Sequence, residues 1–426
     1  MVVRALRTAM ALSAFLLPAC VVKLTDVNAP LENGGVTGPA ADCSKVQPEG
    51  KGGPGSGAAE PRFIGRFDTS AAPNAVFDWS GSSISARFQG SSITAGLVTE
   101  KAVIFTAVID DREPFKFRVL PGQSSYVIAQ GLSSGEHEVT IVRNSEALYG
   151  TTTFTGFQVD GKLLPPIERP RRIEYIGDSI TCGYGNEGAN ATCPFDVPLD
   201  PKVPDGDRIP ISENAYLAYG AIAARQLSAD AVTICFSGKG VYQNYRERGV
   251  GEGPSATGDQ PDPDAKTTMP MCWERTLGSE KDGPKWDFAK EPEPQVVVIN
   301  LGTNDFARDI NQDSIADGID LATFQKTYAD FLATVRSRRP NAHIFLALPP
   351  MVTDKFPLDN ARTDFRNVLN NLVKAANAKG DTKVYFIELV EMGSRYGLGC
   401  DYHPNLEVHR VMADQVAGAI RTKTCW

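Results

Sequence analysis

The second half of the chain alternates between short apolar runs and longer stretches with helical spacing. Runs typical of strands cover residues 172–176, 231–236, 295–301, 343–348 and 383–387, and amphipathic helices are expected over 214–227, 321–338, 361–379 and 406–421. The run 295–301 is apolar almost throughout, as in strands buried on both faces of a parallel sheet. This alternation predicts a doubly wound, three-layer α/β/α domain over residues 170–426, with a parallel sheet of about five strands.

Residues 62–165 follow a different pattern, in which apolar and polar positions alternate over short runs separated by turn residues. Strands are expected in the runs 63–67, 75–79, 83–88, 92–97, 103–109, 115–119, 126–128, 137–142 and 153–157. Strands at this spacing with no helical period are typical of a β-sandwich, and we expect a jelly roll. Pro165, Pro166 and Pro170 then mark a stiff junction with the α/β domain, because proline cannot donate to a sheet ladder.

The N-terminus has the layout of an export signal over residues 1–20. Arg4 and Arg7 precede an apolar run at 10–17 that is too short to span a bilayer, and the run ends in Leu17-Pro18-Ala19-Cys20. That ending resembles a bacterial lipobox, so we expect Cys20 to be lipidated. Plain secretion after cleavage near Ala19 is the alternative. Residues 21–61 are rich in Gly, Pro, Ala and Ser, which predicts a flexible linker.

The net charge of the chain bears on which partners it can bind. The chain has 426 residues, a net charge of −8 and a pI near 5.3, whereas nucleic acids and anionic membranes favour a clustered basic face. We therefore expect no nucleic-acid partner, and membrane contact only through a lipid anchor at Cys20. A neutral or weakly charged substrate fits this composition better, and we expect a monomer.

The eight cysteines of an exported chain indicate disulfides rather than a metal site. No CxxC spacing occurs and the four histidines do not form a ligand set, so we expect neither a metal nor another cofactor. Connectivity cannot be deduced from sequence, but proximity along the chain favours three pairs, with Cys43 left over. These pairs are Cys182 with Cys193, Cys235 with Cys272, and Cys400 with Cys425.

Polar residues follow the carboxyl ends of three predicted strands, where open α/β sheets bind their ligands. They are Ser179, Gly238 and Asn304, and Asp401 and His403 lie in the loop before the last helix. A serine nucleophile needs a base to take its proton, and the base needs a group that fixes its tautomer. Ser179, His403 and Asp401 supply these roles. The backbone N–H groups of Ser179 and Gly238 and the amide of Asn304 are candidates for an oxyanion hole.

These residues resemble the four sequence blocks of the SGNH (GDSL-type) hydrolases. The blocks are Gly177-Asp178-Ser179-Ile180, Gly238, Gly302-Thr303-Asn304-Asp305 and Asp401-Tyr402-His403-Pro404. With the preceding β domain, the chain looks like carbohydrate esterase family 2 from about residue 62 to its end. The resemblance implies deacetylation of acetylated polysaccharides such as xylan or glucomannan through an acyl-enzyme on the serine.

One departure concerns the acid of the triad. The wider superfamily has Asp-x-x-His, whereas Asp401 is only two positions before His403. Carbohydrate esterase family 2 is similar in this shorter spacing, and some of its members use a backbone carbonyl instead. Either the Asp401 carboxylate or a carbonyl is therefore expected to orient His403.

Three aromatic residues in the long loops are candidates for stacking on sugar rings: Tyr184, Tyr242 and Trp273. Two other functions remain open at this point. One is a lipase, thioesterase or peptidoglycan O-acetyl esterase with the same residues, and the other is a surface glycan-binding lipoprotein without turnover. The Gly-x-Ser-x-Gly elbow of the α/β-hydrolases is absent around Ser179.

Overall fold

The computed structural model describes residues 36–37, 41, 52–55, 57–204, 206–246, 266–310, 315–393 and 395–426. The predicted export signal at 1–20 with Cys20, and most of the predicted linker at 21–61 with Cys43, lie outside the described residues. Among the helices of the described part, none combines the length and the apolar composition that a membrane span requires.

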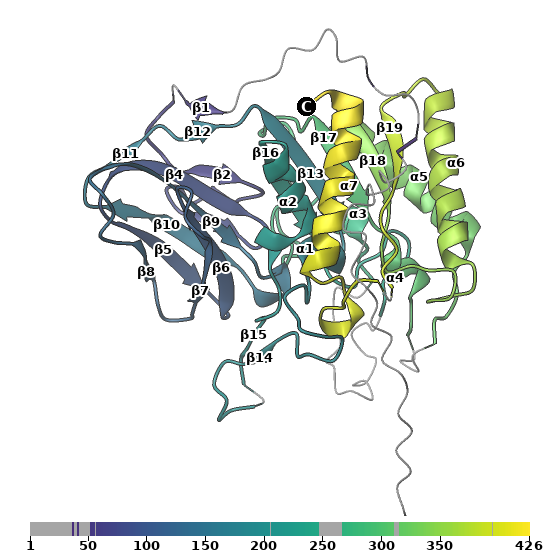
Figure 1. Cartoon of the computed structure of the whole chain (residues 1–426), viewed down its shortest axis with the longest axis horizontal. Helices are drawn as coiled ribbons and strands as arrows, with labels where there is room; N and C mark the ends of the chain where they lie inside the picture. Colours follow the sequence, from purple (N-terminus) through teal and green to yellow (C-terminus); the bar gives the residue numbers. More distant parts are fainter. Residues whose placement is uncertain are drawn as a thin grey trace, which may run out of the picture. The chain divides into compact units, whose positions relative to one another are not determined.

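The predicted β-sandwich is confirmed, and it is antiparallel throughout (Figure 1). One sheet has the strand order β3-β10-β5-β8 and the other β11-β4-β9-β6-β7, with β2 beside β4. Side chains of both inner faces form one core, with Phe77, Phe88, Phe105 and Phe154 all buried. The strands of the sandwich are β2 Arg62–Ile64, β3 Ala75–Phe77, β4 Ser83–Gly90, β5 Ile93–Thr99, β6 Val103–Ile109, β7 Phe115–Val119, β8 Ser125–Ala129, β9 Gly135–Arg143, β10 Thr152–Val159 and β11 Lys162–Leu164. Two further strands, β1 Gly53–Pro54 and β12 Ile167–Glu168, pair with each other in a separate two-stranded sheet. A short 3₁₀ turn, η2, covers Ala147–Tyr149 between β9 and β10.

The α/β domain contains the predicted parallel sheet, in the order β16-β13-β17-β18-β19. Its strands are β13 Arg171–Gly177, β16 Ala229–Cys235, β17 Val296–Asn300, β18 His343–Leu348 and β19 Val384–Glu388. The remaining elements are α1 Ser179–Cys182, β14 Val197–Pro198, β15 Arg208–Ile209, η3 Ala215–Leu217, α2 Tyr219–Gln226, α3 Met269–Cys272, α4 Thr303–Phe306, α5 Leu321–Arg338, α6 Ala361–Ala378, η4 Cys400–Tyr402 and α7 Leu406–Thr424. The helix expected over 214–227 is shorter than predicted, because Ala218 has an extended backbone between η3 and α2.

Alternating side chains of the sheet belong to two hydrophobic layers. Helices α5 and α6 cover one face, where Phe324 and Phe365 belong to the same hydrophobic cluster as Ile176 and Ile299 of the sheet. Helices α2 and α7 cover the other face, against Tyr175 and neighbouring residues (Figure 1). The sheet is therefore buried on both sides, which explains the continuous apolar run of β17.

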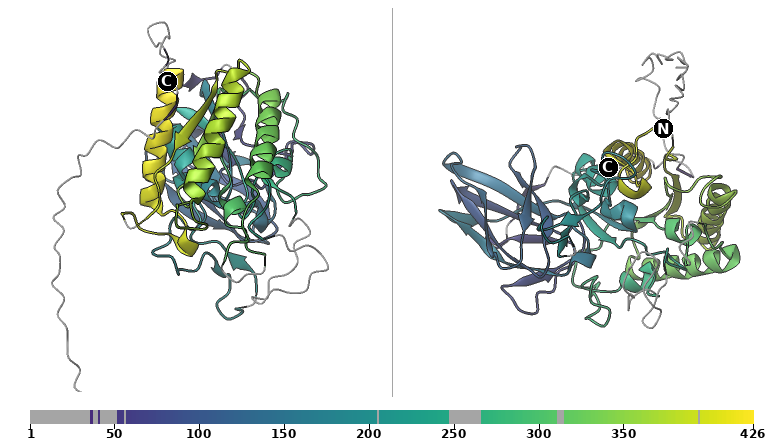
Figure 2. Two further views of the ribbon diagram at one scale, coloured as in Figure 1. Left: turned by 90° about the vertical axis from the view of Figure 1, so that its right-hand side faces the viewer. Right: turned by 90° about the horizontal axis from the view of Figure 1, so that it is seen from below.

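Buried polar contacts join the sandwich to the α/β domain. The sandwich lies beside the α/β domain (Figure 2), and its strand β2 contacts the edge strand β16 of the parallel sheet. There, Arg62 Nη1 donates to the Asp230 carboxylate over 3.0 Å. Trp79 Nε1 donates to the Thr276 carbonyl over 2.9 Å, and the Asp78 carboxylate accepts hydrogen bonds from two N–H groups of the α/β domain. Because buried polar groups are costly to leave unpaired, these contacts make the sandwich and the α/β domain parts of one folded unit.

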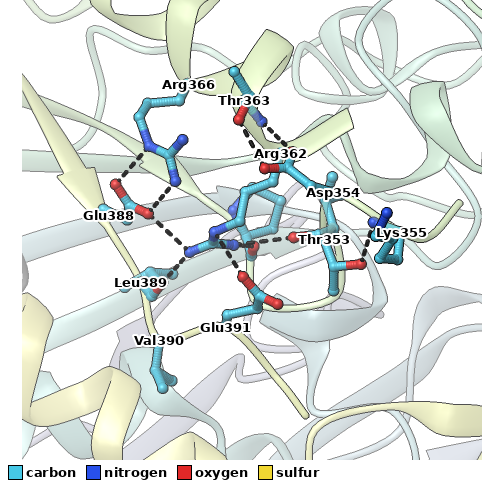
Figure 3. A network of polar contacts seen from close by, with 12 residues as sticks. Thr353, Asp354, Lys355, Arg362, Thr363, Arg366, Glu388, Leu389, Val390 and Glu391 are labelled. Atoms are coloured by element: carbon cyan, nitrogen blue, oxygen red, sulfur yellow. Dashed lines mark hydrogen bonds and ion pairs between the residues drawn. The ribbon is translucent and has the colours of Figure 1, made fainter. Parts of the chain in front are cut away.

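A separate polar network binds the loops that follow the carboxyl ends of β18 and β19. The buried Arg362 guanidinium donates to the carbonyls of Pro349, Val352 and Leu389 over 2.7–3.0 Å (Figure 3). Beside it, Arg366 forms a bidentate pair with Glu388. This network fixes loops at the same sheet edge that bears the polar strand ends described below.

Candidate active site

The candidate site lies at the carboxyl ends of three adjacent parallel strands. Gly177 at the end of β13 is in register with Cys235 of β16 on one side and with Asn300 of β17 on the other. Ser179, Gly238 and Asn304 follow these three positions by two, three and four residues. The register therefore brings the three polar strand ends to one edge of the sheet, as the topology predicts.

Ser179 begins the short helix α1, directly after a tight turn. A side chain at Gly177 would place its Cβ 1.9 Å from Thr181 Oγ1, so the turn requires glycine. The Asp178 carboxylate caps the helix by accepting from the Ile180 N–H over 3.0 Å. Asp178 thus shapes the serine turn, and burial raises the pKa of its carboxyl to about 7.

Ser179 and His403 are hydrogen-bonded to each other. The distance between His403 Nε2 and Ser179 Oγ is 2.8 Å. The two residues are 224 positions apart, so only the fold brings them together. Burial lowers the pKa of the His403 imidazole, which favours the neutral form that a general base needs.

The second ring nitrogen of His403 is bound by a backbone carbonyl. His403 Nδ1 lies 2.9 Å from the Asp401 carbonyl oxygen, so the Nδ1–H donates to it and Nε2 is left as the acceptor. The Asp401 carboxylate points elsewhere and accepts from the Tyr184 hydroxyl over 2.6 Å. Of the two sequence-based alternatives, the structure has the carbonyl. The expectation that the Asp401 side chain contacts His403 is wrong, because Asp401 has a left-handed backbone, with φ of 49°.

The loops that carry Gly238 and Asn304 brace each other. Asn304 Nδ2 donates to the Lys239 carbonyl over 3.0 Å, and the Asp305 carboxylate accepts from the N–H groups of Val241, Tyr242 and Gln243. Gly238 has a left-handed backbone, with φ of 76°. Within the described residues, no protein acceptor is found for the Gly238 N–H, so this donor is available at the sheet edge.

Two disulfides border these loops, and their pairing differs from the sequence-based expectation. Cys182 at the end of α1 pairs with Cys235 at the end of β16, and Cys193 pairs with Cys400. The predicted pairs 182–193, 235–272 and 400–425 are therefore wrong. Cys400 and Cys425 lie at opposite ends of α7, which at about 1.5 Å per residue is far too long to bridge.

Tyr184 lies beside the candidate histidine. Its ring centroid is 4.4 Å from that of His403, and its ring stacks on Phe195 with the centroids 3.7 Å apart. Tyr402, next to His403 in sequence, has a side chain that is 63% exposed. The sequence motif includes Tyr402 without assigning it a role, although its position beside the histidine is a signal for a substrate contact.

Of the other two aromatic candidates, Trp273 is buried and Tyr242 is partly buried. Trp273 is fully buried, and its Nε1 donates to Glu174 of β13 over 2.9 Å, so the prediction that it walls a sugar cleft is wrong. The ring of Tyr242 packs against the hydrophobic cluster under α5. Among the described residues, no ring contact joins Tyr242 to the Ser179–His403 pair.

Comparison with known proteins agrees with this architecture. The family model for the carbohydrate esterase 2 N-terminal domain matches residues 63–166, and the GDSL-like lipase/acylhydrolase model matches residues 175–411. The chain is 35% identical over 366 residues to the cellulase/esterase CelE of Acetivibrio thermocellus, covering 85% of the chain and 39% of that relative. The chain therefore spans about two fifths of the length of this relative.

Two other similar proteins are covered by this chain over most of their length. An acetylxylan esterase / glucomannan deacetylase of Cellvibrio japonicus is 25% identical over 374 residues, covering 86% of the chain and 89% of that relative. A solved family two carbohydrate esterase from Clostridium thermocellum, in complex with cellohexaose, is 33% identical with a TM-score of 0.69. That match covers 85% of the chain and 98% of the solved one.

Proposed function

The chain belongs to carbohydrate esterase family 2, with a hydrolase domain of the GDSL-like lipase/acylhydrolase family, and we propose that it is an exported serine esterase that removes O-acetyl groups from polysaccharides. The observation that carries the proposal is the 2.8 Å hydrogen bond between Ser179 Oγ and His403 Nε2, with Nδ1 held by the Asp401 carbonyl. That pair is arranged for proton transfer from a serine nucleophile.

In the acylation step, Ser179 Oγ attacks the carbonyl carbon of the acetyl ester while His403 Nε2 takes the hydroxyl proton. The negative charge that develops on the carbonyl oxygen is stabilised by the N–H groups of Ser179 and Gly238 and by the Asn304 amide. The C–O bond to the sugar then breaks, and His403 returns its proton to the sugar oxygen. The products of this step are a free sugar hydroxyl and acetyl-Ser179.

In the deacylation step, water replaces the sugar. His403 Nε2 accepts a proton from the water as its oxygen attacks the acetyl carbon, and the same three donors stabilise the charge. The bond to Ser179 Oγ breaks, and Oγ recovers its proton from His403. Acetate leaves and the enzyme returns to its starting state.

Two aromatic residues, one with its ring beside the histidine and one adjacent to it in sequence, support a carbohydrate as the alcohol part of the ester. Tyr402 is largely exposed next to His403, and Tyr184 lies against the imidazole. Flat aromatic rings match the apolar faces of pyranoses, so we assign the sugar-binding contacts to these two residues. A relative that is named for xylan and glucomannan, and a relative that holds cellohexaose, support a β-linked glycan as the substrate.

Export is supported by the disulfides. Two disulfides beside the candidate site, Cys182–Cys235 and Cys193–Cys400, are expected outside the reducing cytosol. The charged and apolar N-terminal segment also supports export. We propose an enzyme of the cell envelope that is anchored through Cys20 or is otherwise secreted.

Acetate release from a panel of acetylated glycans tests the function. Wild type is expected to release acetate from acetylated xylan and glucomannan and to cleave 4-nitrophenyl acetate, whereas Ser179→Ala removes this activity. Ser337→Ala, which deletes an exposed hydroxyl on α5, serves as the matched control and keeps the wild-type rate. Preference for long-chain 4-nitrophenyl esters would instead indicate a lipase, and glycan affinity without acetate release a binding protein.

A further inference from the structure

A residue of the β-sandwich is hydrogen-bonded to the loop of the candidate oxyanion hole. Glu146 follows β9 and precedes η2, and its side chain is buried. Its Oε2 accepts from the Ser237 N–H over 2.7 Å, and its Oε1 accepts from the Ser237 hydroxyl. One carboxylate of the sandwich thus binds the residue directly before Gly238 at two points.

The covalent geometry links this contact to the Gly238 donor. The Gly238 N–H belongs to the peptide plane that follows Ser237, so its direction depends on how Ser237 is held. With the Ser237 N–H and hydroxyl both fixed by Glu146, the remaining freedom of that plane is rotation about one bond. The direction of the Gly238 N–H therefore depends on the Glu146 carboxylate, which belongs to the other domain.

Neighbouring contacts hold Glu146 itself in place. The Glu146 N–H donates to Glu213 over 3.1 Å, and its carbonyl accepts from the buried Arg143 over 3.1 Å. Single polar atoms of Glu146, Glu213 and Cys182 all lie within 4.8 Å of one another. Because the Cys182 sulfur is bound to Cys235, it supplies no thiolate for a metal. That disulfide instead joins the end of α1, the helix that begins at Ser179, to the end of β16.

We infer that Glu146 is a positioning residue for the esterase reaction: through Ser237 it aims the Gly238 N–H at the oxyanion. This inference rests on the proposed function of the Ser179 site. It gives the β-sandwich a part in turnover beyond support of the hydrolase domain. It also implies that the hydrolase domain requires the sandwich for a complete set of oxyanion donors.

The chain contains a matched control for this contact. Asp78, also a buried carboxylate of the sandwich, accepts from the Ser279 N–H over 2.8 Å and from the Ser279 hydroxyl over 2.7 Å. The chemistry is the same as at Glu146 and Ser237, but Ser279 lies in the loop after α3. A merely structural role predicts similar effects for both carboxylates, whereas positioning predicts an effect on turnover only at Glu146.

The experiment compares Glu146→Gln, Ser237→Ala, their double variant and Asp78→Asn in the full chain. We expect both Glu146→Gln and Asp78→Asn to lower the melting temperature, but only Glu146→Gln to lower kcat, by about 10- to 100-fold with KM little changed. Ser237→Ala keeps the N–H contact and is expected to lose less. Because Glu146 and Ser237 act through the same contact, their effects on log kcat should not add in the double variant.

Two results overturn the inference. It fails if Glu146→Gln keeps the wild-type kcat below its melting temperature, or if Asp78→Asn loses kcat to the same degree. Wild type and Ser179→Ala are measured alongside. Equal acetate release by those two would show that the proposed function itself is wrong and would remove the inference with it. If Ser179→Ala loses acetate release and Glu146→Gln does not, only the role of Glu146 is refuted.

Discussion

The Asp401 carbonyl oxygen lies 2.9 Å from His403 Nδ1, while the carboxylate of the same residue binds the Tyr184 hydroxyl. The histidine is thus oriented by the backbone, in a loop with left-handed residues at 401 and 402. A dyad supported by a carbonyl lacks the negatively charged carboxylate that a triad aspartate would place beside Nδ1. This difference has consequences for both mutation and pH.

Asp401→Asn is expected to lower kcat by less than about tenfold, because the carbonyl that holds Nδ1 is retained; loss of a true triad aspartate costs about 10⁴-fold. Steady-state kinetics on 4-nitrophenyl acetate would measure the change. His403→Gln is the comparison, and it should lose nearly all activity. An equal loss in both variants would mean that the carboxylate orients the histidine in solution.

The pH dependence follows from the lowered pKa of His403. Activity requires a neutral imidazole, so kcat/KM falls when pH drops below the pKa of that ring. Burial lowers this pKa, which places the acid limb below the ordinary histidine value of about 6.5. The Asp401 carboxylate acts in the opposite direction, so Asp401→Asn should shift the limb further toward acid. A limb that stays in place or moves toward neutral pH in Asp401→Asn contradicts this account.

Asn304→Ala removes one proposed oxyanion donor. We expect kcat to fall about 10²- to 10³-fold while KM changes little, because the amide acts mainly on charge that develops in the transition state. Kinetics at saturating substrate separate the two constants. Asn341→Ala, in an exposed turn before β18, is the control and should match wild type. A rise in KM at constant kcat would place Asn304 in ground-state binding instead.

The Cys193–Cys400 disulfide ties the histidine loop to the segment that carries Phe195. Replacing both cysteines by serine should lower kcat as well as the melting temperature, because Cys400 is only three residues from His403. Turnover is measured well below the melting temperature to separate the two effects. Wild-type kcat in a protein that merely melts earlier would limit the disulfide to stability.

The sequence predicts those parts of the fold that depend on local periodicity. Helix α5 and strand β18 have the expected bounds, and the strand ends at Ser179, Gly238 and Asn304 meet because parallel register leaves little choice. Contacts between segments that are distant in sequence could not be predicted in this way. Nothing local indicates that Glu146 binds Ser237, that Cys193 pairs with Cys400, or that Trp273 turns inward toward Glu174. Such contacts depend on how the sandwich and the loops dock, which no single stretch of sequence encodes.

In the proposed reaction, Ser179 carries the acetyl group between acylation and deacylation. Rapid acid quench during turnover of 4-nitrophenyl acetate, followed by peptide mass spectrometry, tests it directly. We expect an acetyl group on the peptide that contains Ser179 in wild type and none in Ser179→Ala, which should also be inactive. Acetylation at another residue, or turnover retained by Ser179→Ala, would contradict it.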